Sequence, residues 1–157
     1  MNQKNKRLLI FGLIIIIASL FLSSYSDPTI PYLFSLKRSQ EKVFQKLQLS
    51  DEQKLNFNQN LLNARLLELQ SIVNTKSYPL ILQASLRYST TAGDITNLII
   101  NSGFKDKISL MQVVFSNHQK VFQQLIDNYP KDYNVEWKYL QDDFNYLKIY
   151  KDQLSKI

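Results

Sequence analysis

An apolar run near the N-terminus, Leu8–Leu22, constrains this chain more than any other feature, because no charged residue interrupts it. The charge-free stretch continues to Ser26. A helix over residues 8–26 would be about 28 Å long, close to the thickness of about 30 Å of a bilayer's hydrocarbon core. A basic tail, residues 1–7, precedes the run, and basic residues favour the cytoplasmic side. The sequence therefore predicts a transmembrane anchor with a cytoplasmic N-terminus.

The same segment also fits a secretory signal peptide. The small-x-small triplet that ends at Ser26 would allow cleavage before Asp27 and release a secreted domain. Against cleavage, Tyr25 is bulky, alanine is missing there, and the apolar run is long for a signal. We expect an uncleaved anchor and keep secretion after cleavage near Ser26 as the alternative. The expected layout is a tail (1–7), an anchor or signal peptide (8–26), a proline-containing linker (27–31) and an extracytoplasmic helical domain (32–157).

Composition excludes several classes of function for the exported part. Of nineteen lysines and arginines, three precede the apolar run, which leaves sixteen against thirteen acidic residues. This balance does not suit a nucleic-acid-binding protein. The chain has no cysteine, which excludes disulfides, thiolate metal sites and cysteine nucleophiles. Three glycines and four prolines in 157 residues argue against an architecture of strands and tight turns.

Apolar residues recur every three and four positions through most of the chain, as amphipathic helices require. Ser50 with Gln53 forms a capping box at the start of the clearest helix, and Gly103 is suited to a left-handed helix end. The pattern weakens over Thr90–Asp94, so helix continuity there stays open. Short loops favour antiparallel neighbours. We predict an all-α protein, a transmembrane helix followed by an antiparallel bundle of four to five helices. The expected helices are 32–49, 51–74, one that starts at Ser77 and is clearest over 80–88, with 94–100 as its continuation or a separate piece, 107–128 and 134–155.

Three sequence segments resemble the bacterial family DUF5667, a domain of unknown function that usually follows a signal or an anchor. They are a proline-to-Lys-Arg entry, a serine-capped Ala-Arg-Leu-x-Glu helix, and a histidine helix that leads into a proline, here Pro31–Arg38, Ser50–Leu69 and His118–Pro130. Their order and spacing extend over about residues 28–155. The resemblance implies a tethered or exported helical domain and implies no activity.

The predicted helix over 107–128 carries an apolar stripe at strict three-and-four spacing: Ile108, Met111, Phe115, His118, Phe122, Leu125 and Tyr129. His118 is the single residue that most invites a functional interpretation, because it is the only histidine and lies on this stripe. A zinc site in a helical bundle needs three or four ligands, commonly with a glutamate three residues before the histidine. Phe115 occupies that position. We expect a packed histidine bonded to a neighbour, and we keep a metal- or cofactor-binding bundle that uses His118 as an alternative. No residue set indicates a catalytic, cofactor or metal site.

Other polar and aromatic groups carry weaker indications. Lys37, Arg38, Lys42 and Lys46 form a basic face beside the expected membrane and are candidates for contact with anionic lipid or polymer. Adjacent Asp142 and Asp143 are about 100° apart on a helix, which prevents them from acting together on one bond. We interpret them as a solvated acidic patch. An aromatic group on the last helix, Trp137, Tyr139, Tyr146 and Tyr150, is suited to core packing or to a protein-binding groove.

The expected function is therefore that of a non-enzymatic, membrane-anchored helical domain of the bacterial envelope. Its expected partners are the lipid bilayer, through Leu8–Leu22, and another envelope protein, and it would bind no nucleic acid. We expect no cofactor.

Overall fold

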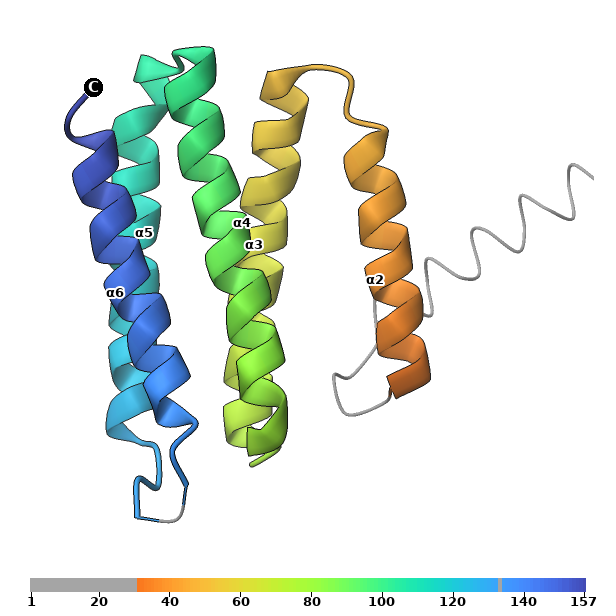
Figure 1. Cartoon of the computed structure of the whole chain (residues 1–157), viewed down its shortest axis with the longest axis vertical. Coiled ribbons are helices and arrows are strands. Elements are labelled where there is room, and N and C mark those ends of the chain that lie inside the picture. Colours follow the sequence, from red (N-terminus) through yellow and green to blue (C-terminus); the bar gives the residue numbers. More distant parts are fainter. Residues whose placement is uncertain (1–30, 133) are drawn as a thin grey trace, which may run out of the picture. The chain divides into compact units, whose positions relative to one another are not determined.

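Every regular element in residues 31–132 and 134–157, which the computed structural model describes, is helical (Figure 1). The all-α prediction is confirmed for this part of the chain. The predicted tail (1–7) and anchor (8–26) lie outside the described residues. None of the described helices combines the length and the apolar character that crossing a membrane requires. Contacts divide the chain into two units, Met1–Leu47 and Gln48–Ile157, which we describe separately.

The described part of the first unit is helix α2, Pro31–Lys46. Its first residue lies in the expected linker 27–31, because a proline is tolerated in the first turn, where its missing N–H would have no helical partner. The helix ends three residues before the expected position. Beyond its end, the N–H groups of Leu49 and Ser50 bond the side-chain oxygen of Gln53, at 3.0 and 3.3 Å, so the backbone turns instead of continuing as helix.

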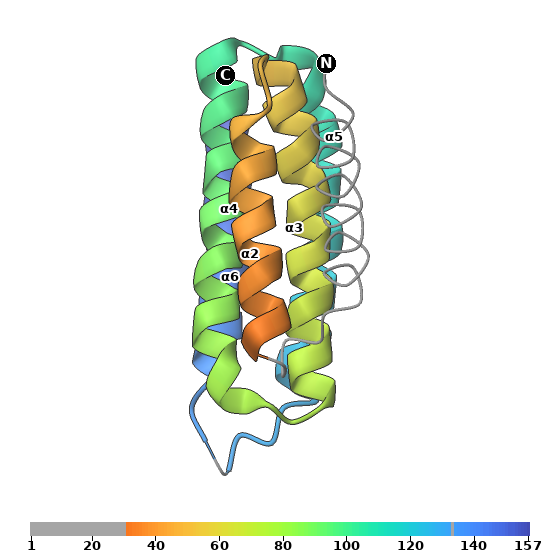
Figure 2. The same cartoon turned by 90° about the vertical axis from the view of Figure 1, so that its right-hand side faces the viewer.

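The second unit is a bundle of four long helices with one short 3-10 turn. The elements are α3 (Asp51–Asn74), η1 (Tyr78–Leu80), α4 (Ile81–Ser102), α5 (Lys105–Asp127) and α6 (Trp137–Leu154). Helices that follow one another run antiparallel, so α4 and α6 are parallel (Figures 1 and 2). Helix α4 packs against both α3 and α6, and α5 packs mainly against α6. The predicted antiparallel order holds for successive helices of this unit.

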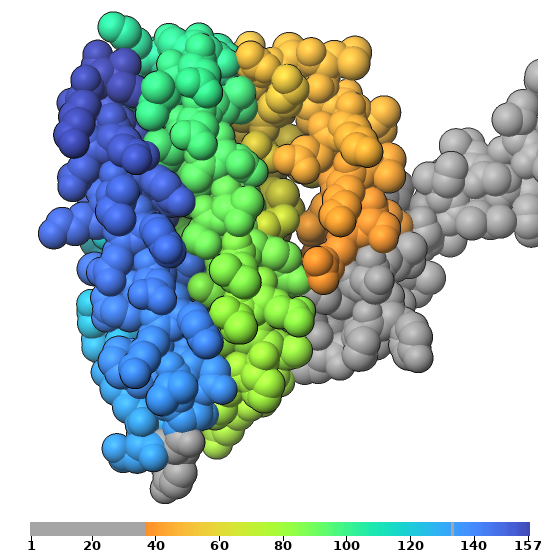
Figure 3. Space-filling view, in the orientation of Figure 1, coloured from red at the N-terminus to blue at the C-terminus, as the bar shows by residue number. Residues whose placement is uncertain are grey.

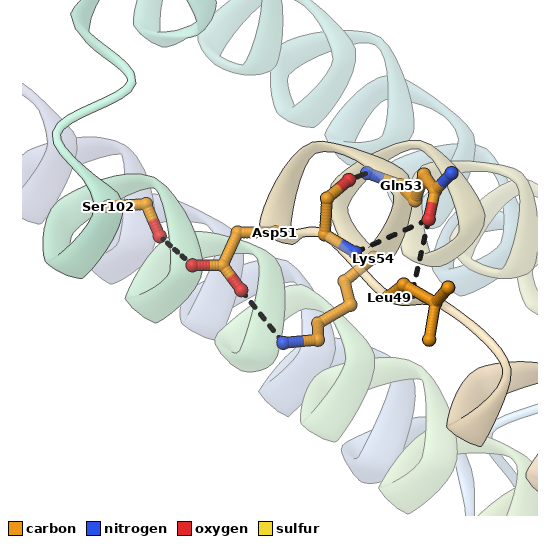
Figure 4. A network of polar contacts seen from close by, with 6 residues as sticks. Leu49, Asp51, Gln53, Lys54 and Ser102 are labelled. Carbon is orange, nitrogen blue, oxygen red and sulfur yellow. Dashed lines mark hydrogen bonds and ion pairs between the residues drawn. The ribbon is translucent and has the colours of Figure 1, made fainter.

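The start of α3 is fixed by the predicted capping box (Figure 4). The Ser50 hydroxyl accepts the N–H of Gln53 at 3.2 Å, and the Gln53 side chain accepts the N–H of Ser50 in return. The Asp51 carboxylate accepts bonds from Lys54 at 2.8 Å and from Ser102 at 2.9 Å. These bonds, the one from Lys54 foremost, lower the pKa of Asp51. The bond from Ser102 links the beginning of α3 to the end of α4.

Helix α4 is continuous through Thr90–Asp94, which settles the point that the sequence left open. The Thr90 and Thr91 hydroxyls donate to backbone carbonyls one turn earlier, those of Leu86 at 2.7 Å and Arg87 at 2.9 Å. Both hydroxyls therefore find their partners within the helix. The helix ends at Gly103, whose φ of 66° is in the left-handed region. This confirms the predicted cap, which glycine adopts at little steric cost.

The core of the second unit lies along the centre of the four helices. The stripe predicted on the fourth helix is confirmed, since its members from Met111 to Tyr129 are buried and Ile108 packs against them. Helix α6 begins at Trp137, three residues later than predicted. The largest fully buried side chains come from all four helices: Leu55, Leu62, Leu69, Tyr88, Ile95, Ile99, Met111, Phe115, Phe122 and Leu140.

Candidate functional site

His118 joins a chain of polar side chains that enters the bundle from one side. Its Nε2 lies 3.0 Å from the Oδ1 of Asn63 on α3, and its Nδ1 lies 2.8 Å from the Tyr88 hydroxyl on α4. The Asn63 side chain is exposed, His118 is 7% exposed and Tyr88 is fully buried. The imidazole therefore connects the surface between α3 and α5 with the interior of the bundle.

The two partners of His118 determine where its proton lies. An amide oxygen can only accept a hydrogen bond, so Nε2 carries the hydrogen that is donated to Asn63. In a neutral ring the other nitrogen is then an acceptor, and the Tyr88 hydroxyl donates to Nδ1. Burial lowers the pKa of His118 from 6.5 to about 4, so the ring is neutral at physiological pH. Both ring nitrogens are thus engaged by side chains of the bundle.

Asp143 on α6 is the most unusual polar group of the bundle. It is 1% exposed, and neither of its carboxylate oxygens has a hydrogen-bond partner within the described structure. The nearby Ser85 hydroxyl donates instead to the carbonyl of Tyr139 at 3.2 Å. Burial raises the pKa of Asp143 to about 8; the closeness of the Ser85 hydroxyl opposes this rise and the Asp142 charge adds to it. The carboxyl is therefore mainly protonated at neutral pH.

The location of Asp143 corrects a prediction. The solvated acidic patch is confirmed for Asp142, which is exposed, and is wrong for Asp143. The physical reason is helical spacing, because Asp143 lies three residues after Leu140 and four before Leu147, both fully buried. That spacing was visible in the sequence, and it was the signal that could have identified a buried carboxyl.

Asp143 lies close enough to the His118 chain to influence it electrostatically. Burial first, and then the charge of Asp143, raise the pKa of Tyr88 well above its ordinary value. Asn63, Tyr88, His118 and Asp143 thus come from α3, α4, α5 and α6 respectively. The bundle also buries other polar side chains, Asn58, Ser85, Thr91 and Thr96. The sequence singled out His118 alone. Nothing in the spacing of Asn63 distinguishes it from other exposed asparagines.

The four basic residues of α2 do not form one uniform face. Arg38, Lys42 and Lys46 are exposed, whereas Lys37 is partly buried. No ion pair within the described residues involves any of them.

Small residues on α4 allow α6 to approach closely. A side-chain carbon added at Gly93 would lie 3.0 Å from the Tyr150 hydroxyl oxygen, tighter than ordinary contact. That hydroxyl donates to the carbonyl of Ser89 at 3.4 Å. The Tyr150 ring is stacked on the Tyr146 ring, with centroids 6.2 Å apart and an angle of 18° between the planes. Glycine and serine thus create the space that the tyrosines of α6 occupy.

The predicted aromatic group of α6 therefore divides between core and surface. Trp137, Tyr139 and Tyr150 pack partly buried against the core, and Lys131 lies 5.3 Å from the centroid of the Trp137 ring. Tyr146 is 45% exposed. The group does not line one continuous groove.

Helices α3 and α4 are joined by a partly buried ion pair. The Glu68 carboxylate pairs with the Arg87 guanidinium, and Arg65 donates to the backbone carbonyl of Arg87. These side chains link two helices and hold the α3–α4 contact in register.

A shallow hollow of about 510 Å³ lies on the outer side of α5 and α6. Its lining is mixed: Ser109, Gln112, Val113, Ser116, Asn117, Lys151, Asp152 and Ser155. The Gln112 side chain donates to the Ser155 hydroxyl at 2.8 Å. Lys151 beside it donates to the Gln119 oxygen at 3.2 Å. These groups bond mainly to one another, as on an ordinary hydrated surface.

No three histidine or acidic side chains within residues 31–132 and 134–157 gather closely enough to hold a metal ion. The partners of His118, an amide and a phenol, are both engaged with it. The described residues therefore offer His118 no set of metal ligands.

The chain was compared with protein-family models, curated proteins and solved structures. No significant match was found. The resemblance to DUF5667 therefore stays a prediction, and the function has to be argued from the residues themselves.

Proposed function

We propose that this chain is a non-enzymatic, membrane-anchored protein whose helical domain lies outside the cytoplasm and serves as an interaction or structural module of the bacterial envelope. The uncharged run Leu8–Leu22 after a basic tail supports the anchor and its orientation. The engagement of both His118 nitrogens inside the bundle supports a structural role for the only histidine.

The observation that carries the interaction role is an exposed apolar strip at the junction of α4 and α6. Its members, Leu82, Leu86 and Tyr146, are 40%, 58% and 45% exposed. The two helices lie side by side on the face shown in Figure 3. Exposed apolar side chains on two helices that pack side by side favour contact with a partner, because such contact removes them from water. We call these three residues the α4–α6 strip.

The level of the strip along the bundle follows from two bonds that cross the junction. Tyr150 bonds the carbonyl of Ser89, one turn above Leu86. Ser85, which precedes Leu86, bonds the carbonyl of Tyr139. Tyr146 lies four residues before Tyr150 and seven residues after Tyr139 on α6, so the two bonds place it between about the levels of Ser85 and Ala92 on α4, a stretch that includes Leu86. An aromatic ring and leucines exposed along one junction suit the apolar side chains of a docked protein segment.

The anchor and its orientation are tested with the full chain fused at its C-terminus to alkaline phosphatase, which is active only outside the cytoplasm. We expect phosphatase activity, recovery with membranes and resistance to alkaline carbonate extraction. Ile15→Arg should lower recovery with membranes, because a charge within a membrane-spanning helix costs about 3 kcal/mol. An inactive fusion would refute the orientation. An intact mass that begins at Asp27 would show cleavage and leave a secreted domain.

The interaction role is tested with a photo-crosslinking amino acid placed at Leu86 in cells, with Lys120 on α5 as an exposed control position. We expect a discrete crosslinked envelope protein at Leu86, absent at Lys120 and lost when Tyr146→Glu is introduced. Equal crosslinking at both positions would refute the role of the strip.

The alternative function, a metal- or cofactor-binding bundle, would be supported if native mass spectrometry of the purified chain showed a bound species that His118→Gln removed.

A further inference from the structure

Helix α2 combines an apolar strip with basic side chains on both of its flanks. Val43 near the end of α2 and Leu47, the residue that follows the helix and whose N–H still bonds the Val43 carbonyl at 3.2 Å, are 57% and 61% exposed. At about 100° per residue, Lys42 and Lys46 lie roughly 80° to 120° to one side of the centre of this strip, and Lys37 lies roughly 100° to the other side. Arg38, roughly 160° away, points from the opposite side of the helix. We call Val43 and Leu47 the α2 strip.

The flanking lysines are available for an anionic partner. Lys42 and Lys46 are exposed and Lys37 is partly exposed. None of them forms an ion pair within the described residues. A helix with apolar side chains on one face and lysines beside them is typical of helices that lie in the interface of a bilayer, since the lysine stems reach along the apolar region while the ammonium groups stay with the headgroups.

The covalent distance to the proposed anchor restricts where α2 can lie. The charge-free stretch ends at Ser26 and α2 begins at Pro31. The backbone between them reaches about 17 Å at full extension. A helix tethered so closely to a transmembrane segment stays near the headgroups, at a high effective concentration of lipid phosphate.

We propose that α2 lies along the surface of an anionic lipid bilayer, with the α2 strip inserted among the headgroups and with Lys37, Lys42 and Lys46 beside lipid phosphates. This inference rests on the proposed membrane anchor and adds the lipid class that the helix next to the anchor recognises. Its selectivity comes from charge, since each cation near an anionic surface strengthens binding about fivefold. Three cations together should therefore strengthen it about 100-fold.

The chain contains no cysteine, so single introduced cysteines allow the environment of α2 to be measured in the full chain. Val43→Cys and Gln45→Cys are each labelled with the fluorophore NBD and reconstituted into phosphatidylcholine vesicles with or without phosphatidylglycerol. Gln45 is exposed and lies roughly 180° from the centre of the α2 strip, which makes it the matched control. We expect blue-shifted, brighter emission at position 43 only, and only with phosphatidylglycerol.

The charge variants test the contribution of the flanks. In the Val43→Cys background, Lys46→Gln should raise the fraction of phosphatidylglycerol needed for half of the blue shift, whereas Arg38→Gln, which removes the same charge from the far side, should change it little. High salt should act like Lys46→Gln, because it screens the lysines. Equal effects of the two variants would overturn the assigned orientation.

Failure of this inference can be told apart from failure of the anchor. If the labelled chain does not float with vesicles at high salt, the anchor is wrong. If it floats and the NBD at position 43 reports the same aqueous environment as at position 45, the anchor stands and the placement of α2 is overturned. A blue shift produced by soluble polyphosphate without vesicles would identify an anionic polymer as the partner and would also overturn the inference.

Discussion

Asp143 should make the stability of the bundle fall as the pH rises through neutrality. The folded protein raises the pKa of this carboxyl from its ordinary value of 3.8 to about 8. Between these two values the folded state holds a proton that the unfolded state has released. The free energy of unfolding therefore decreases by about 1.36 kcal/mol for each pH unit in this interval. The whole interval corresponds to roughly 6 kcal/mol, an order-of-magnitude figure for a buried group.

His118 acts in the opposite direction over part of the same range. The fold lowers the pKa of this ring from 6.5 to about 4, so its contribution to stability is complete above pH 6.5 and is lost as the pH falls toward 4. The contributions of Asp143 and His118 oppose each other between about pH 4 and 6.5, where their slopes nearly cancel. Above pH 6.5 the Asp143 slope acts alone, which lowers the stability of the wild-type protein by about 2 kcal/mol up to pH 8.

The test is the pH dependence of urea unfolding of the full chain in a mild detergent. Unfolding is followed by far-UV circular dichroism and by the fluorescence of Trp137, the only tryptophan. Asp143→Asn removes the ionisation and should give stability that rises from pH 4 to 6.5 and then stays level. A buried amide without partners lowers the free energy of unfolding by about 1 to 3 kcal/mol at every pH. The informative quantity is therefore the change of the free energy of unfolding with pH, not its value at one pH.

Asp142→Asn is the matched control, because Asp142 is the adjacent carboxylate and is exposed. Its free energy of unfolding should fall with rising pH as that of the wild type does, and the fall should end at a slightly lower pH, because the Asp142 charge contributes to the raised pKa of Asp143. The free energy of unfolding of Asp143→Asn minus that of the wild type should rise steadily from pH 4 to pH 8. A difference that is constant over this range would refute the reasoning, because it would show that Asp143 ionises alike in the folded and unfolded states.

Three further substitutions test local features of the bundle by the same unfolding measurement. Tyr88→Phe removes the donor to His118 Nδ1, at 2.8 Å, and should cost about 1 to 3 kcal/mol because the buried nitrogen loses its partner; an unchanged midpoint would contradict the bond. Ser50→Ala should cost about 1 kcal/mol and Ser50→Gly only a few tenths, and equal losses would argue against the cap. Gly103→Ala should cost about 1 kcal/mol through its φ of 66° alone, since no atom lies within 4 Å of the added carbon; Gly103→Asn should recover part of that loss.

The sequence determined the helices where local interactions dominate. The capping box at Ser50 and the glycine end at Gly103 were both predicted, because each depends on residues within one or two turns. The stripe from Met111 to Tyr129 was also predicted, since a period of three and four places its members on one face. The α2 boundaries differed by one and three residues, because helix ends depend on single hydrogen bonds such as those to Gln53.

Tertiary structure decided the points that depend on a neighbouring helix. The stretch around Gly93 has weak helix propensity, yet α4 continues through it because packing against α6 stabilises it. Arg87 pairs with Glu68 of α3, and a partner nineteen residues away cannot be read from the local pattern. Asn63 became a partner of His118 only because α3 and α5 meet beside the ring.

The placement of Asp143 shows the division most clearly. Its spacing from Leu140 and Leu147 was present in the sequence, and that spacing alone placed it on the buried face of α6. The sequence could not show that the Ser85 hydroxyl would bond a backbone carbonyl and leave both carboxylate oxygens without a partner. Helical periodicity therefore determined which side chains face inward, because it is a property of one helix. Whether a buried polar group is satisfied was decided by the helices packed around it, because its partners come from other parts of the chain.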